Sequence, residues 1–464
     1  MKRRDLLAAA ALSACGAARA QAAAFAPADL AHAAALRTAG LADTEAWRLL
    51  EGITTEIGAR PAGSAAEARA AQWAVAALTK LGLANARAEP LPMKQWQRGP
   101  ASARLVAPAP HALVMAALGN SVGTPPEGIE AEIAWYSDLA ALRADTTDKA
   151  KGRIVFLDQK TDRTKDGSGY GRAVGARFGG AVEAAKRGAL ALAIRSIGTD
   201  RDRVAHTGAM GYDIAVPRIP AFAVSVPDAE LITRLVARGS TPRLAVNFET
   251  RSDVDATTHN VIAEVPGTDL AQEIVLIGAH LDSWDLGQGA VDDGAGIAIV
   301  SAAAALIQRA GKRPRRTVRV VLFGNEENGF DGARGYGDRH GSAVHQLVAE
   351  SDFGAGRIWR FASRVQPAAL PLADAIGQQL APLGIERGDN AAGPGPDAAV
   401  LMRRHKWPAV QLHQDGTNYF DVHHTENDVL DKVDPAPLPQ NVAAWAVTAW
   451  LAAQSPLPFG PPPL

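Results

Sequence analysis

The chain has almost no cysteine and no excess of either charge. Cys15 is the only cysteine among 464 residues, which excludes an intramolecular disulfide. The 48 Lys and Arg residues nearly balance the 49 Asp and Glu residues, so the sequence lacks the basic field expected of a protein that binds nucleic acid or an anionic membrane. Beyond the N-terminal segment there is no uninterrupted run of about 18 or more apolar residues, the length that spans a bilayer. The composition therefore predicts a globular protein stabilised by core packing and by any metal that it binds.

The first 24 residues have the pattern of a signal peptide. A positive region at 2–4 precedes a short apolar stretch at 6–14, and small residues at 18–20 form a cleavage site. The pair Arg3-Arg4 is typical of a twin-arginine export signal. Residues 12–15 also resemble a lipoprotein signal, with lipid attached at Cys15. We therefore expect an exported protein, periplasmic or secreted, and leave open whether it carries a lipid anchor.

One stretch places metal-type ligands directly after a strand: EIVLIGAHLDSWDLGQGAVDDGAG. The apolar run at 274–277 predicts a strand that is buried on both faces. His280 and Asp282 follow it, and Asp292 and Asp293 stand just before an Ala-rich helix. In open α/β sheets, sites lie at the carboxyl ends of strands. The residue types favour a metal centre over the alternative, a polar loop with N-capping aspartates.

Similar groups of polar residues occur three more times downstream. Glu326 and Glu327 follow a second apolar run, and adjacent glutamates point in different directions, so one can bind metal while the other moves a proton. Asp352 follows a third short run, and His423-His424 lie beyond the last one. Each group alone has an ordinary explanation, such as a solvated acidic turn or a structural histidine. Their recurrence at successive strand ends favours the metal centre.

The remaining pattern predicts an α/β fold with an insertion. The predicted segments are a signal peptide at 1–24, a core at 25–115 and 253–455, an insertion at 116–252, and a Pro-rich tail at 456–464. In the core we expect strands at 261–265, 273–279, 317–323 and 409–412 and helices at 296–310, 371–380 and 441–453. In the insertion we expect short strands, one clear helix at 179–187 and glycine-rich loops, including GSGYG at 167–171. This succession of short strands and glycine-rich loops predicts a β-rich inserted domain.

These motifs resemble those of the co-catalytic di-zinc aminopeptidases, and of their carboxypeptidase Q branch in particular. The resembling stretches are GNSVGTPPEG (119–128), IRS (194–196), HTG (206–208), HLDSWDLGQGAVDDGAG (280–296), NEEN (325–328) and ESDFG (350–354). They extend over nearly the whole chain after the signal. The resemblance implies a mixed-sheet zinc aminopeptidase core of the phosphorylase/hydrolase-like type, an inserted protease-associated domain and a homodimer.

Carried over position by position, the resemblance implies two zinc ions and five ligands. His280 and Asp352 would hold one zinc, Glu327 and His424 would hold the other, and Asp292 would bridge them. His424 is preferred over its neighbour because the family's ligand histidine directly precedes Thr or Ser.

The resemblance also implies the residues that handle protons. Glu326 would be the general base, and Asp282 would orient His280 by a hydrogen bond to its second ring nitrogen. Asp293 would be a neighbour of the site rather than a ligand. Asp397 resembles a family residue near the substrate pocket, but the flanking proline leaves its role open, and we do not assign it to the site.

We therefore predict an exported zinc metallopeptidase of the aminopeptidase or dipeptidase type. Two metals about 3.5–4 Å apart activate a shared water, and Glu326 would take its proton and return it to the leaving amine. The substrates would be dipeptides or short peptides with a free N-terminus. Two alternatives stay open on the same fold: an inactive binding or receptor protein, and a single-zinc acyl transferase. Retention of all five ligands and the base favours the two-metal hydrolase.

Three other features have weaker functional interpretations. Residues 119–123 fit the G-x-S-x-G nucleophile elbow, but Thr124-Pro125-Pro126 argues against the helix that must follow it. The stretch 167–171 lacks the lysine and preceding strand of a phosphate loop, so we expect a flexible loop. His206 and Tyr212 could face the cleft from the insertion, although a structural role is commoner for a single histidine.

Overall fold

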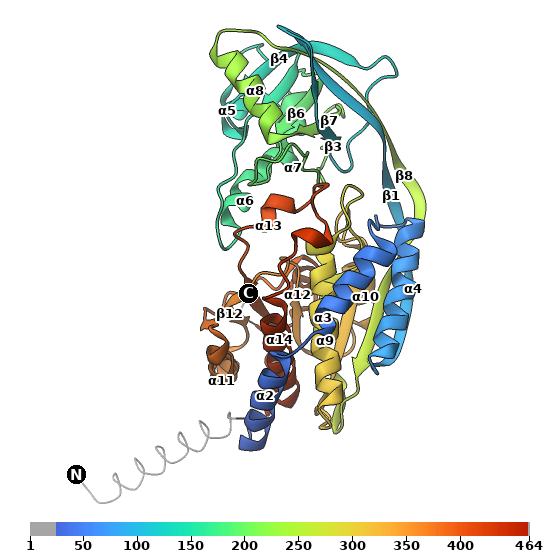
Figure 1. The fold of residues 1–464 in the computed structure, drawn as a ribbon, viewed down its shortest axis with the longest axis vertical. Helices are drawn as coiled ribbons and strands as arrows, with labels where there is room; N and C mark the ends of the chain where they lie inside the picture. Colours follow the sequence, from blue (N-terminus) through green and yellow to red (C-terminus); the bar gives the residue numbers. More distant parts are fainter. Residues whose placement is uncertain (1–24, 463–464) are drawn as a thin grey trace, which may run out of the picture.

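The computed structural model describes residues 25–462, which form two lobes joined by a long two-stranded ribbon (Figure 1). The ribbon consists of β1 (Ala84–Ala107) and β8 (Arg243–Val265), which pair antiparallel along their lengths. One end of β8 pairs with the sheet of the core lobe, and the other end pairs with the sheet of the second lobe. The predicted signal peptide and Cys15 lie outside the described residues.

The core lobe is built on a mixed sheet with four parallel strands at its centre. The strand order is β13-β12-β14-β11-β9-β10-β8. The central parallel strands are β14 (Ala409–Gln414), β11 (His345–Glu350), β9 (Leu270–His280) and β10 (Arg316–Phe323). The flanking β12 (Ile358–Arg364) runs antiparallel to β14, β8 runs antiparallel to β10, and β13 (Glu386–Arg387) pairs parallel with β12 at the edge. The mixed α/β fold expected from the sequence is confirmed.

Helices cover both faces of this sheet because the central strands are apolar on both sides. Val275 and Ile277 of β9 belong to one core cluster, and Ile274 and Leu276 belong to another. The first cluster lies under α2 (Pro27–Gly40), α3 (Glu45–Gly52), α4 (Ala65–Lys80), α9 (Ala295–Arg309), α11 (Leu370–Leu380) and α14 (Leu438–Gln454). The second cluster lies under α10 (Asp331–His340) and α12 (Pro396–His405).

Among the described residues, one helical stretch, Ala290–Arg309, has the length and mean hydropathy of a membrane span. Asp292 and Asp293 interrupt its apolar residues, so it contains no run of 18 consecutive apolar residues. Its most apolar window is entirely buried inside the protein. In this structure it is the central helix of the core, where small alanine side chains let the sheet and α14 approach closely.

The second lobe contains more helix than the sequence suggested. Its sheet has the order β4-β5-β6-β7-β3, with β4 (Ile129–Tyr136), β5 (Ile154–Leu157), β6 (Ala191–Arg195), β7 (Ala221–Val224) and β3 (Met115–Ala117); β2 (His111–Leu113) pairs with β1. Its helices are α5 (Leu139–Ala144), α6 (Ser168–Ala173), α7 (Gly175–Ala185) and α8 (Val226–Ala237). The expectation of a single clear helix was wrong, and so was the loop predicted at 167–171, most of which lies in α6.

The predicted limits of the insertion fall inside strands. Residue 116 lies in β3, and residue 252 lies in the middle of β8. The central part of β8 is largely exposed, so the alternation of apolar and polar residues stops there while the pairing with β1 continues. Composition therefore changes within the ribbon, at a point where the backbone has no boundary.

Candidate metal centre

The predicted ligands lie at one edge of the core sheet, where its four parallel strands end. His280 is the last residue of β9, Glu327 follows β10, and Asp352 follows β11. His424 comes after β14 and the short helix α13 (Tyr419–Val422), and Asp292 lies in the turn that precedes α9. Because β14, β11, β9 and β10 are neighbours and parallel, their carboxyl ends bring these five residues together.

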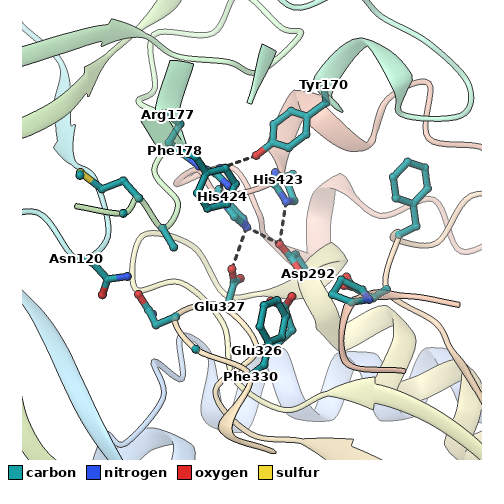
Figure 2. Close-up of a pocket in the computed structure, with 18 of the residues that line it drawn as sticks. Asn120, Tyr170, Arg177, Phe178, Asp292, Glu326, Glu327, Phe330, His423 and His424 are labelled. Carbon is teal, nitrogen blue, oxygen red and sulfur yellow. Dashed lines mark hydrogen bonds and ion pairs between the residues drawn. The ribbon is translucent and has the colours of Figure 1, made fainter. Parts of the chain in front are cut away.

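Asp292 lies at the centre of the group, with one oxygen toward His280 and the other toward His424, and Figure 2 shows the contact with His424. Its Oδ1 is 2.8 Å from His280 Nε2, and its Oδ2 is 3.1 Å from His424 Nε2. Glu327 Oε2 lies 3.0 Å from His424 Nε2, and Asp352 Oδ1 lies 3.7 Å from His280 Nε2. The five side chains thus form two sets of donors that share Asp292.

The charges and donor atoms of this group fit zinc. Burial opposes protonation of His424, but Glu327 and Asp292 outweigh it and raise its pKa to about 9. In the same way, Asp292 and Asp352 outweigh burial and raise the pKa of His280 well above its usual value. Glu327 Oε1 is buried without a hydrogen-bond partner in the part of the chain that the structure describes. Imidazole nitrogen and carboxylate oxygen are zinc donors, and a divalent cation would replace the protons that these carboxylates hold on the histidines.

Two further histidines lie against His424. His423 Nε2 is 3.3 Å from Asp292 Oδ2, and His423 Nδ1 is 3.1 Å from Nε2 of His206 in the second lobe. The three imidazoles form a buried group that could itself hold a metal ion. His424 lies near both Asp292 and Glu327, which favours it as the ligand of the shared centre.

Asp282 supports the site mainly through the backbone. Its carboxylate accepts hydrogen bonds from the backbone N–H groups of Glu326 and Glu327, at 3.0 and 3.4 Å. His280 Nδ1 lies 3.0 Å from the Asp282 carbonyl oxygen but 3.8 Å from its carboxylate. The carbonyl, rather than the carboxylate that we predicted, is therefore the closer partner of the ring. The same residue fixes the turn that carries both glutamates.

Asp293 is close enough to His280 and Asp352 to be counted among possible metal donors. Its two oxygens, however, accept hydrogen bonds from the backbone N–H groups of His280 and Gly296, at 3.1 and 3.0 Å. This use of both oxygens explains why Asp293 is better placed to shape the site than to bind metal. Burial raises the pKa of its carboxyl well above the usual range.

Glu326 lines the cavity beside the ligands. Burial, together with the like charges of Asp352 and Glu327, raises the pKa of its carboxyl well above the usual range. A carboxylate with a raised pKa next to an open cavity is suited to accept and return a proton near neutral pH. The position therefore fits the general base predicted from the sequence.

The cavity in front of the ligands has a volume of about 500 Å³ and is walled by both lobes. Its apolar lining is Phe178, Met210, Phe330, Phe353, Tyr419 and Phe420. Arg177, Asn120 and Tyr170 reach it from the second lobe (Figure 2). A space of this size suits a small ligand rather than a folded protein.

Arg60, which no motif in the sequence singled out, is fully buried beneath the loop that joins His280 to Asp292. Its guanidinium donates to the carbonyl oxygens of Leu281, Gln288 and Gly289, at 2.6, 2.8 and 3.0 Å. These carbonyls belong to the loop that joins His280 to Asp292. The local sequence GARPAG indicated only a turn. It does not show that the Arg60 side chain reaches carbonyl oxygens more than 200 residues further along the chain.

The second lobe is held to this loop by Trp284. The indole packs in the apolar cluster of that lobe and edge-on to Trp96, with ring centroids 6.2 Å apart. A side chain at Gly119 would collide with the indole, which explains the first glycine of GNSVG. Ser121 of that motif is buried, and its hydroxyl oxygen accepts from the N–H of Ala221 at 2.8 Å, so it is part of the packing and not a nucleophile.

Comparison with known proteins gives consistent matches over most of the chain. Residues 260–449 match the model of Peptidase family M28. Carboxypeptidase Q of Bos taurus is 35% identical over 416 residues, which cover 89% of this chain and 86% of that protein. The solved structure of a Peptidase M28 precursor from Shewanella amazonensis SB2B is 43% identical, with a TM-score of 0.91 over 94% of this chain and 99% of that one. A zinc aminopeptidase from Bacillus subtilis, 18% identical with a TM-score of 0.60 over 87% of this chain and 94% of that one, shares the fold.

Proposed function

The chain belongs to peptidase family M28 and is a zinc-dependent metallopeptidase, and on that premise we propose that it is a two-zinc exopeptidase of dipeptides or short peptides. The observation that carries the two-metal assignment is the position of Asp292, whose two oxygens face His280 and His424 separately. A carboxylate with one oxygen toward each of two donor sets suits a bridging ligand. The single-zinc acyl transferase is disfavoured because Asp352 and Glu327 complete a set on each side.

In this proposal each residue of the group has one task. His280 and Asp352 would hold one zinc, and Glu327 and His424 would hold the other, with Asp292 common to both. When bound, zinc would activate a water and polarise the carbonyl of the peptide bond to be cut.

The chain's own residues then manage position and proton transfer. Glu326 takes a proton from the attacking water and returns it to the leaving amine. Asp282 holds the N–H groups of Glu326 and Glu327, so it fixes the base and a ligand in one turn. The aromatic walls of the cavity exclude water and contact the substrate side chains. The limited volume favours short peptides over long ones.

The cellular setting and assembly also belong to the proposal. The signal-like residues 1–24 support export to the periplasm or the medium, with Cys15 as a candidate lipid site. The second lobe, which is linked by the ribbon and contributes to the wall of the cavity, supports the protease-associated insertion that the sequence resemblance implies. A homodimer rests on that resemblance alone.

The test compares the wild-type protein with Glu326→Gln. We expect the wild type to hydrolyse dipeptides with a free amine but not their N-acetyl forms, and the variant to lose turnover while it keeps its zinc. Glu426→Gln, the same change at an exposed position near the ligand histidine, is the matched control and should keep full activity. A metal-loaded wild type that cleaves no free-amine peptide would contradict the proposal and favour the binding or acyl-transferase alternatives.

A further inference from the structure

A buried arginine of the second lobe faces the substrate cavity without an acidic partner. Arg177 is 5% exposed and lines the cavity, yet no Asp or Glu oxygen of residues 25–462 lies within 4.0 Å of its guanidinium. Its Nη1 donates to Tyr170 Oη at 2.5 Å and to the Thr207 carbonyl at 3.3 Å. Its Nε is buried without a hydrogen-bond partner among the same residues. An unpaired buried cation is costly, so this position suits an anionic ligand.

The guanidinium lies directly behind one of the proposed zinc ligands. Nη1 of Arg177 is 3.5 Å from Nδ1 of His424, whose Nε2 faces Asp292 and Glu327 (Figure 2). The close approach depends on Gly208, because a Cβ there would lie 2.1 Å from Nη1 of Arg177 and 2.8 Å from Nδ1 of His424. The missing side chain at residue 208 thus leaves room for the arginine beside the metal centre.

The carboxylates nearest to this cation do not remain available to it when zinc is bound. Glu327 and Asp292 would then be committed to the metal, and Tyr170 Oη is a neutral acceptor, since burial raises its pKa to about 12. Arg334 is the other arginine that lines the cavity, but its side chain is more than half exposed and donates to the Gly329 carbonyl. Arg177 is therefore the cavity cation that most needs a counter-charge.

We propose that Arg177 binds the C-terminal carboxylate of the substrate, one residue beyond the bond that is cut. This inference rests on the proposed peptidase function and names the residue that would recognise the free carboxylate of the substrate. One residue spans at most about 3.6 Å, so the C-terminal carboxylate of a dipeptide lies close to the bond that is cut. Arg177 is placed to reach such a carboxylate, because its guanidinium lies beside His424, a proposed ligand of the metal. A guanidinium binds a carboxylate with two parallel hydrogen bonds, which also fixes its orientation.

The walls of the cavity indicate which side chain would sit beside that carboxylate. Phe178 follows Arg177 in α7 and is half exposed at the cavity, and Phe330, Phe353, Tyr419 and Phe420 also line it. We therefore infer a dipeptide whose C-terminal residue is apolar or aromatic. A longer peptide would place an uncharged amide where the carboxylate binds, and would leave the cation unpaired.

The experiment compares three substrates that differ only past the scissile bond: Ala-Phe, Ala-Phe amide and Ala-Phe-Ala. The zinc-loaded full chain should cleave Ala-Phe with the highest kcat/KM. Arg177→Met should lower kcat/KM for Ala-Phe by about 100-fold, the effect of losing one partner of a buried charged pair, mainly through KM. The same variant should change kcat/KM for Ala-Phe amide by less than about threefold. Arg177→Lys keeps the charge but loses the paired geometry, so its kcat/KM for Ala-Phe should lie between the values of the wild type and Arg177→Met.

Two controls separate this role from a structural one. Arg334→Met removes the other cavity arginine and should leave the preference for the free carboxylate intact. Calorimetric binding of Ala-Phe to the turnover-deficient Glu326→Gln protein should weaken on adding Arg177→Met, while the zinc content stays unchanged. Equal losses on Ala-Phe and its amide, or a loss of preference in Arg334→Met instead, would overturn the assignment while leaving the peptidase function in place. If the wild type cleaves none of the three, the proposed function itself fails.

Discussion

Replacement of Arg60 by methionine should destabilise the protein by about 3–5 kcal/mol and weaken zinc binding. Arg60 is fully buried, and its three donor nitrogens each reach a carbonyl of the loop between His280 and Asp292. Methionine keeps much of the apolar volume but removes the guanidinium donor of all three carbonyls; among the described residues, the Gly289 carbonyl alone keeps a second donor, the N–H of Gly294 at 3.0 Å. A hydrogen bond to a charged group contributes about 1.5–3 kcal/mol, and relaxation of the loop with entry of water would recover part of the sum.

The effect on the metal follows from the place of the loop in the chain. The loop begins at His280, a ligand of one zinc, and ends at Asp292, the proposed bridging ligand. Loss of the Arg60 hydrogen bonds to the loop should therefore lower zinc affinity by about 10–100-fold, as for other residues that orient ligands. Denaturant unfolding followed by tryptophan fluorescence gives the first quantity, and competition with a chelator gives the second. Arg48→Met, at a side chain that is 70% exposed, should stay within about 0.5 kcal/mol. A loss below about 1 kcal/mol with unchanged zinc affinity for the Arg60 variant would refute the reasoning.

Three further predictions concern pH, the second lobe and a helix cap. The zinc-free protein should lose stability as pH rises from 7 to 9. Burial raises the folded-state pKa of Asp282 and Asp428 to about 7, and Glu327 and Asp292 raise the pKa of His424 to about 9, so the folded state binds more protons than the unfolded state in this range. A denaturation midpoint that rises with pH would contradict this prediction. Trp284→Ala should cost about 3–5 kcal/mol, with reduced protection of the second lobe in hydrogen exchange, and unchanged protection would count against the anchor. Ser64→Ala should cost about 1 kcal/mol in thermal unfolding, because the hydroxyl caps α4 by accepting from the N–H of Glu67 at 3.1 Å, and Ser64→Thr should retain most of that stability.

The sequence allowed the core and the meeting of polar groups at one sheet edge to be predicted because both follow short-range rules, whereas the choice of five ligands among those groups came from the family resemblance. Apolar runs such as 274–277 mark strands that are buried on both faces, and parallel strands end at the same edge of the sheet. Polar residues directly after those runs therefore had to meet. The expected helices at 296–310 and 441–453 correspond to α9 and α14, with small shifts at their ends.

Features that depend on long side chains or on unusual local composition escaped the same reasoning. Arg60 and Arg177 act on atoms far away in the chain, and a sequence pattern does not show where a guanidinium ends. Helix α6 holds two glycines in six residues, so its sequence resembles a loop, whereas α7 overlaps the helix expected at 179–187 and begins four residues earlier. The ribbon half of β8 has too few buried residues to show the alternation of a strand.

The zinc content of the purified chain tests the central claim most directly. After dialysis against metal-free buffer, mass spectrometry under native conditions should find two zinc ions per chain in the wild type. Asp292→Ala, which removes the shared carboxylate, should lose at least one ion and most dipeptide hydrolysis, whereas Asp338→Ala at an exposed position should keep both. A single zinc in the wild type, or two zincs retained in Asp292→Ala, would contradict the account of Asp292 as the bridge.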